Sequence, residues 1–100
     1  EAYDLAVKAR KSLPDDPELA QTLAKLSYDR NEFAYAVQLL KQSAERRPLD
    51  AQDLYYLGMS QLKGKDKIQS RETLSQALSA GLQNPLATEA RRVLAELEAN

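Results

Sequence analysis

Several residue types that carry much of protein chemistry are missing. The 100-residue chain has no cysteine, no histidine and no tryptophan. Without cysteine, disulfides, thiolate metal sites and thiol catalysis are excluded. Without histidine, the commonest metal ligand and general base is absent too. We therefore expect no enzyme, no metal site and no bound cofactor.

Excess charge and long apolar runs are also lacking. Fourteen basic and fifteen acidic residues leave a net charge of −1, whereas nucleic-acid binders usually carry a basic surface. No apolar run approaches the roughly 20 residues of a membrane-spanning helix. We expect no nucleic-acid partner and no direct membrane insertion. The composition fits the cytoplasm and the periplasm equally well.

What is present favours helix. Glycine and proline are scarce, at three and four residues, and Ala, Leu, Gln, Glu, Lys and Arg dominate. All six are good helix formers. The length is that of one ordinary domain. The composition predicts an all-α protein.

Helix starts recur at one fixed period. Three sites place a good N-cap residue before a position that suits the first residue of a helix: Asp16-Pro17, Asp50-Ala51 and Asn84-Pro85. The cap residues stand at positions 16, 50 and 84, so the same interval separates each from the next. We call it the repeat interval. A constant interval of about 34 residues indicates an array of helix-turn-helix repeats.

Apolar periodicity predicts two antiparallel helices after each of the first two caps. The first helix runs from Pro17 to Arg30, Asn31 offers a turn, and the second runs from Phe33 until Arg46-Arg47-Pro48 ends it. The next pair begins at Ala51, breaks around Gly64 and closes at Gly81, which suits a left-handed C-cap.

Half units flank these pairs. Ala2, Ala6 and Ala9 lie one repeat interval before Ala36, Leu40 and Ser43, so the segment 1–14 is predicted to be the second helix of a truncated repeat. The segment 85–98 is predicted to be a capping helix, because Arg91 and Arg92 replace the earlier Leu-Ala and Leu-Gly pairs. The last helix of a solenoid needs such a solvated face.

At these positions the chain resembles the tetratricopeptide repeat (TPR) family. Leu54, Leu57 and Gly58 match the first part of the family pattern in the second unit. Further signature positions are matched in the first unit by Leu23-Ala24, Phe33, Ala36, Leu40, Ser43-Ala44 and Pro48. The chain departs from the family pattern at three positions: serine stands at Ser27, glycine comes one residue early at Gly64, and lysine stands at Lys67. The overall style of the sequence resembles bacterial members.

The resemblance implies an α-α superhelix, a TPR solenoid of six helices. The expected single domain covers 1–100: a partial repeat at 1–14, repeats at 17–50 and 51–84, and a cap at 85–98. Because the first residue is Glu1, the chain is expected to be the C-terminal fragment of a longer array.

In this family the first helices line a concave groove that binds an extended peptide or a partner helix. By repeat position, the residues expected to face the groove are Gln21, Lys25, Tyr28, Gln52, Tyr55, Tyr56, Met59, Leu62, Lys63, Glu89 and Val93. Tyr55 and Met59 are central to the most apolar stretch, and such side chains are enriched at interfaces. Packing of Tyr28 and Tyr56 against a neighbouring helix is the alternative.

Some TPR domains clamp a C-terminal carboxylate with Lys, Asn and Arg. Here the corresponding positions hold Gln21, Lys25, Tyr56, Leu86 and Ala90, so only one lysine is available. The resemblance thus implies a protein-binding scaffold of a different ligand type. Two alternatives stay open: a structural element that self-associates through its truncated end, and an accessory domain of a larger enzyme.

Overall fold

The computed structural model describes residues 2–99, and within that range it contains six α-helices and no strand. The prediction of an all-α chain with six helices is confirmed. Consecutive helices pack against one another in antiparallel fashion within each of two compact units, Glu1–Leu49 and Asp50–Asn100.

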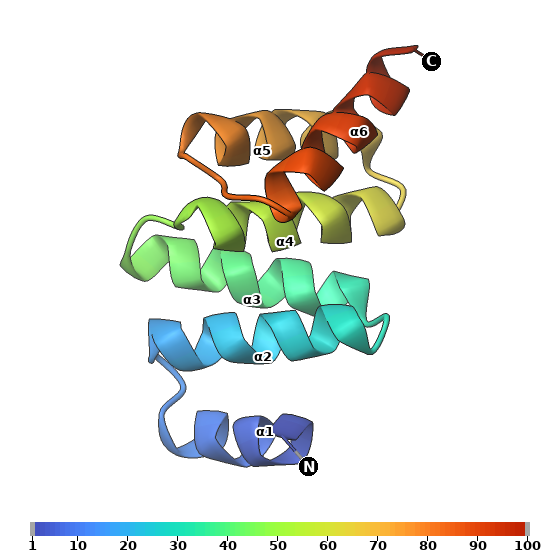
Figure 1. Ribbon diagram of the computed structural model, residues 1–100. Coiled ribbons are helices and arrows are strands. Elements are labelled where there is room, and N and C mark those ends of the chain that lie inside the picture. Colours follow the sequence, from blue (N-terminus) through green and yellow to red (C-terminus); the bar gives the residue numbers. More distant parts are fainter. Residues whose placement is uncertain (1, 100) are drawn as a thin grey trace. The chain divides into compact units, whose positions relative to one another are not determined.

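The first unit contains α1 (Ala2–Ser12), α2 (Pro17–Asp29) and α3 (Phe33–Arg46). As predicted, Asp16 caps α2: its carboxylate accepts the backbone N–H groups of Glu18 and Leu19 at 3.0 and 3.4 Å. An aspartate here satisfies amides that have no partner within the helix. Helix α2 packs against both α1 and α3 (Figure 1).

The second unit contains α4 (Ala51–Lys63), α5 (Lys67–Ser79) and α6 (Leu86–Ala99). The predicted cap Asp50 accepts the N–H of Asp53 at 2.8 Å. Asp66 caps α5 in the same way through the N–H of Gln69, at 3.2 Å, a cap that the spacing of the helix starts does not reveal. Helix α4 packs against α5 and also contacts α6 (Figure 1).

The turns within the two helical hairpins α2–α3 and α4–α5 have the same geometry. Asn31 and Lys65, which are one repeat interval apart, both adopt left-handed backbone, with φ of 65° and 71°. In each turn the following amide donates to the carbonyl five residues before it, at 2.9 and 2.8 Å. This hydrogen bond defines the Schellman ending of a helix. Gly64 has φ −81°, so Lys65 and not the glycine occupies the left-handed position.

The entry to α6 differs from the predicted one. The Asn84-Pro85 peptide bond is cis, and the helix begins at Leu86, one residue later than predicted. Asn84 still acts on the first turn, because its side-chain oxygen accepts the backbone N–H of Thr88 at 3.2 Å. Gly81 has φ 92° just after α5, which confirms its predicted left-handed conformation.

The cores of the two hairpins use equivalent positions. Small residues are buried at equivalent positions of the two first helices, Ala24 in one hairpin and Gly58 in the other. The Oγ of Ser70 donates to the carbonyl of Gly58 at 2.8 Å. The pairs of positions one repeat interval apart that are buried in both hairpins are Leu23 and Leu57, Ala24 and Gly58, Ser27 and Gln61, Ala36 and Ser70, Leu39 and Thr73, Leu40 and Leu74, and Ser43 and Ala77.

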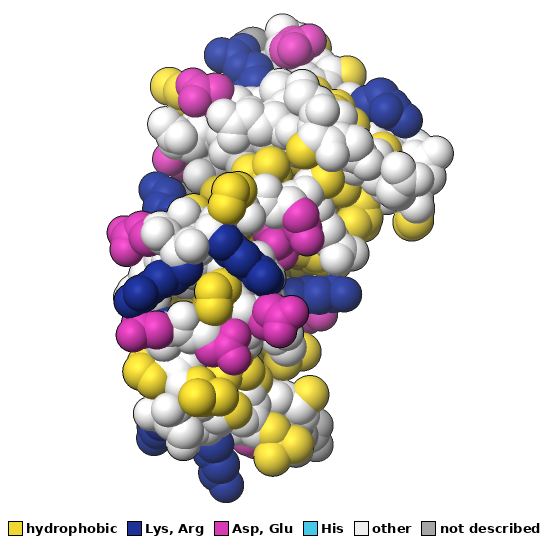
Figure 2. Space-filling model, turned by 90° about the vertical axis from the view of Figure 1, so that its left-hand side faces the viewer, with side chains coloured by type: hydrophobic (Ala, Val, Ile, Leu, Met, Phe, Trp, Pro, Cys, Tyr) yellow, Lys and Arg dark blue, Asp and Glu magenta, His cyan; other side chains and the backbone are white. Residues whose placement is uncertain are grey.

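Charged side chains of both signs are scattered over the face drawn in Figure 2. On the face drawn in Figure 2, Lys and Arg side chains lie among Asp and Glu side chains, and no large area carries one sign alone. This distribution fits the balanced composition.

Candidate partner-binding surface

The residues expected to bind a partner fall into three classes of exposure in the second unit. Tyr55, Met59 and Val93 are buried, with 6%, 4% and 3% of their surface exposed. Half-buried positions are Tyr56, Leu62 and Glu89, and exposed positions are Gln52 and Lys63. The surface that a partner can reach is therefore formed by the last two classes.

The depth of burial along α4 has a packing cause. An amphipathic helix that packs on one side buries a stripe about 100° wide, yet residues 57–61 of α4 are buried without interruption. Helix α4 contacts α5 and also α6, so more than one of its faces is covered. In this arrangement Tyr55 and Met59 contribute to the interior, and they offer a partner little surface.

The two adjacent tyrosines of α4 interact with each other. The rings of Tyr55 and Tyr56 are 5.2 Å apart at 82°, an edge-to-face arrangement. This geometry places the positive edge of one ring against the negative face of the other. The buried Tyr55 ring thereby contacts the ring of the half-buried Tyr56, which borders the accessible surface.

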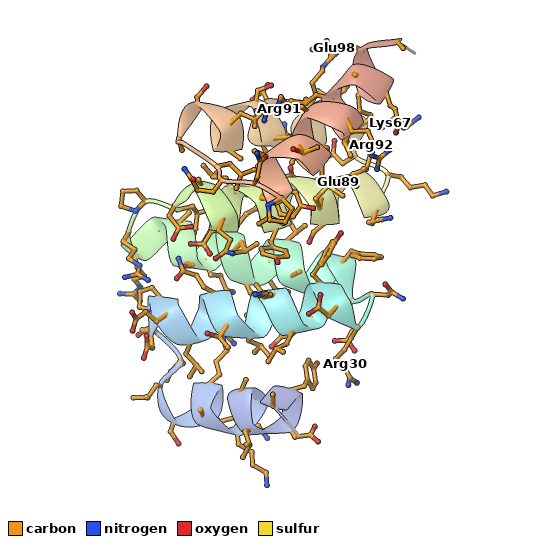
Figure 3. The ribbon with its side chains drawn as sticks, viewed as in Figure 1. Arg30, Lys67, Glu89, Arg91, Arg92 and Glu98 are labelled. Carbon is orange, nitrogen blue, oxygen red and sulfur yellow. The ribbon has the colours of Figure 1, made fainter. Side chains whose placement is uncertain are left out.

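Glu89 is the centre of a charged cluster on α6. Arg92 donates to its two carboxylate oxygens at 3.0 and 2.6 Å, and also to Glu96 at 2.7 Å (Figure 3). The hydrogen bonds from Arg92 lower the pKa of Glu89, with a further contribution from the charge of Lys63 on α4. In turn, the hydrogen bond and the charge of Glu89, together with Glu96, raise the pKa of Arg92. Lys63 and Glu89, both predicted candidates, are thus electrostatically coupled.

In the first unit the candidates Gln21, Lys25 and Tyr28 follow one another at intervals of four and three residues, which places them on one face of α2. The side chain of Gln21 accepts a hydrogen bond from Arg47 at 2.8 Å. The Tyr28 ring meets the ring of Phe33 edge-on, at 5.6 Å and 63°. Lys25 is exposed. Tyr28 is half-buried and packs partly against the start of α3.

A second cluster was not predicted from the sequence. The hydroxyl of Tyr3 on α1 donates to Glu32 at 2.8 Å, and the guanidinium of Arg30 lies 4.0 Å from the centre of the Tyr3 ring. Arg30 also forms an ion pair with Glu32 at 3.4 Å. The hydrogen bond to Glu32 raises the pKa of Tyr3. The three residues join α1 to the α2–α3 turn, and no local pattern shows a contact between segments so far apart in the sequence.

Two surface pockets lie away from the predicted residues. One of about 730 Å³ is lined by residues of α5, its C-terminal cap residue Ala80 and the end of α6, including Ile68, Ser75 and Glu98. Another of about 320 Å³ lies in the first unit beside Asp15 and Arg46, which form an ion pair at 2.8 Å. Neither pocket is lined by a candidate residue.

No protein-family model matches the chain, and no curated protein shows significant similarity to it. Within residues 2–99, no three acidic side chains gather closely enough to hold a metal ion. None of the helices in that range has the length and hydrophobicity needed to cross a membrane. The geometry of the chain therefore carries the functional proposal.

Proposed function

We propose that the chain is part of a TPR-type helical repeat array that binds a protein or peptide partner and catalyses no reaction. The observation that carries this proposal is the equivalence of the hairpins α2–α3 and α4–α5. Their buried positions, their N-caps and their left-handed turn residues recur one repeat interval apart. A helical pair of this length cannot bury its apolar face alone, and stacking of such pairs creates extended surfaces used for binding.

The binding surface in this proposal lies on the first helix of each hairpin. On α2 it includes Gln21, Lys25 and Tyr28, and on α4 it includes Gln52 and Tyr56, which are all at least partly exposed. Leu62, Lys63 and Glu89 extend it in the second unit. The mixture of aromatic, amide and charged groups fits an extended peptide that is held by apolar contacts and side-chain hydrogen bonds.

In the proposed binding surface, the buried side chains Tyr55, Met59 and Val93 support the residues that contact the partner. Their low exposure means that a partner would contact their neighbours, while they hold those neighbours in place. Alanine at Tyr55 or Met59 would therefore alter stability as well as binding, because large buried side chains cost about 2–5 kcal/mol when truncated. Exposed positions provide the sharper test.

The test begins with a peptide library displayed on phage and selected against the immobilised chain. Affinities of selected peptides are then measured by fluorescence anisotropy for two matched pairs of variants. Gln52→Ala on α4 is compared with Gln69→Ala on α5, and Lys25→Ala on α2 with Lys41→Ala on α3. All four positions are exposed, so none of the substitutions is expected to disturb the fold.

We expect Gln52→Ala or Lys25→Ala to weaken binding by at least about fivefold, because a contact that matters costs about 1 kcal/mol or more when truncated. The partner variants Gln69→Ala and Lys41→Ala should leave affinity unchanged. Equal effects within both pairs would refute the assignment of the surface to the first helices. Failure of every selected peptide to bind saturably would refute the binding function itself.

A further inference from the structure

One face of α5 carries a projecting apolar side chain beside an open hollow. Ile68 is 70% exposed. The surface pocket of about 730 Å³ lies along the same face, and its lining includes the small side chains of Ser75 and Ser79. The end of α6 borders this pocket at Glu98 (Figure 3). A smaller adjoining pocket is lined by Ile68 and Leu97, so apolar surface from both helices is accessible here.

The equivalent positions of α3 show neither the projection nor the hollow. One repeat interval earlier, Ala34 stands at the position of the isoleucine, and Lys41 and Glu45 stand at the positions of the two serines. All three are exposed. Alanine is too short to project, and long charged side chains cover the helix surface around them. The face of α5 thus departs from the repeat at both features together.

Two residues of opposite charge flank the line that joins Ile68, Ser75 and Ser79. Successive residues of an α-helix are turned by about 100°, so this line stays on one side of α5, and Arg71 and Glu72 lie on its two flanks. Both are exposed. Within residues 2–99 neither of them forms an ion pair with another side chain. We call these five residues the α5 face.

The two charges decide how the α5 face can meet a copy of itself. A twofold axis parallel to the helices exchanges the flanks, so Arg71 of each copy lies beside Glu72 of the other copy. A twofold axis across the helices makes them antiparallel and keeps each flank with itself, so equal charges meet near the axis. The patch is therefore complementary to itself only in the parallel pair. In that pair Ile68 meets its own copy, and the small serines let the two backbones approach.

We propose that the α5 face is the interface of a homodimer, in which two copies of the chain pack their α5 helices in parallel around a twofold axis. The interface lies on a second helix, so it is distinct from the proposed partner-binding surface on the first helices. It also lies outside the segment 1–14. The inference does not depend on the proposed function.

The charge balance favours a second copy as the occupant. The charged residues that line the two adjoining pockets are Lys67, Arg71, Glu72 and Glu98. Their charges sum to zero, so they offer no net attraction to a strongly acidic or strongly basic partner. The net charge of the whole chain is −1, which adds little repulsion between two copies.

Sedimentation velocity measures the dimer at concentrations from about 10 µM to about 1 mM, the range in which a small interface dissociates. We expect the sedimentation coefficient to rise over this range. Ile68→Asp should raise the Kd of the dimer at least about tenfold, because it places two equal charges on the axis. Position 68 is exposed, so the circular dichroism spectrum should stay unchanged. Lys41→Glu on α3 is the matched control and should leave the Kd unchanged.

Charge exchange tests the parallel geometry. Arg71→Glu alone makes acids face acids, and Glu72→Arg alone makes bases face bases. Each variant by itself should therefore dimerise at least about tenfold more weakly than the original chain, since two symmetric pairs turn from attraction to repulsion. An equimolar mixture of the two variants restores both opposite-charge pairs in a heterodimer. The mixture, and also the chain that carries both substitutions, should dimerise about as strongly as the original chain.

A chain that stays monomeric over the whole range would overturn the proposal, and so would a dimer that Ile68→Asp leaves intact. Single charge reversals without effect would exclude the parallel pair. If the chain is monomeric and a peptide selected from a library binds it in a way that Ile68→Asp abolishes, the face belongs to a foreign partner and the proposal is wrong. None of these results changes with Gln52→Ala or Lys25→Ala, so the proposed partner-binding surface is tested separately.

Discussion

Substitution of Gly58 by alanine tests the close contact between α4 and α5 in the second unit. A Cβ atom at this position would lie 2.7 Å from both Cγ and Cδ2 of Leu74, and 3.3 Å from the backbone nitrogen of Leu74. Real Cβ atoms almost never approach another heavy atom to 2.7 Å. Leu74 is 0% exposed, so its side chain is surrounded by other atoms and cannot turn out into solvent.

Two opposing effects decide whether Gly58→Ala raises or lowers the free energy of unfolding. Alanine is favoured over glycine within a helix by about 1 kcal/mol. Overpacking of a filled core costs about 1–3 kcal/mol, and the upper half of this range applies because the clash involves the branch point of a fully buried leucine. The difference predicts that Gly58→Ala lowers the free energy of unfolding by about 1–2 kcal/mol. For a chain of this size, that corresponds to roughly 5–15 °C in melting temperature.

The assay is urea unfolding followed by circular dichroism at 222 nm. Gly58→Ala is measured in the original chain and in a Leu74→Ala background. Without the leucine side chain the two 2.7 Å contacts are gone and only the 3.3 Å approach to the backbone nitrogen remains. Helix propensity should then dominate, and the same substitution should stabilise by up to about 1 kcal/mol. An osmolyte can be added equally to all samples if the background is only partly folded. A Gly58→Ala chain that is more stable than the original would refute the reasoning.

The remaining predictions concern turns and charges. Both Gly81 and Lys65 have positive φ, so Gly81→Ala should lower the free energy of unfolding by about 1 kcal/mol and Lys65→Gly should raise it by up to about 1 kcal/mol. Urea unfolding measures both changes. A lower free energy of unfolding for Lys65→Gly would contradict the argument. Arg92 lowers the pKa of Glu89 in the folded chain. The pair therefore contributes its full stabilisation above the ordinary glutamate pKa of about 4.3. This contribution is lost as the pH falls through the lower pKa that Glu89 has in the folded chain. Glu89→Gln should therefore make the acid-induced loss of stability shallower than Glu98→Gln does, and identical acid profiles for the two variants would contradict the coupling.

The helices and most of their ends follow from local sequence. Asp16 and Asp50 act as caps because their short acidic side chains reach amides two or three residues ahead. The positive φ of Gly81 follows in the same way from its missing Cβ atom. The sequence did not indicate the left-handed residue of the turn that breaks the helices around Gly64. Lysine at position 65 is an ordinary helix former, yet it occupies the left-handed turn position.

The candidate surface was less predictable than the fold. Repeat position places Tyr55 and Met59 on the first helix of a hairpin, but it does not state how much of each side chain neighbours cover. Burial at 6% and 4% depends on packing around α4, a property of several helices together. The pairing of Tyr3 with Glu32 is likewise a contact between segments that no periodicity relates.

The sequence by itself determined what depends on neighbours along the chain: an all-α protein, six helices, the caps Asp16 and Asp50 and the constant interval between equivalent positions. These features arise from hydrogen bonds and side-chain contacts within a few residues. Only the tertiary structure decided which apolar side chains are covered. It buried Tyr55 and Met59, brought Gly58 against Leu74 and left Leu5 exposed. Burial depends on the helices that pack against a position, and distant segments of the chain supply them.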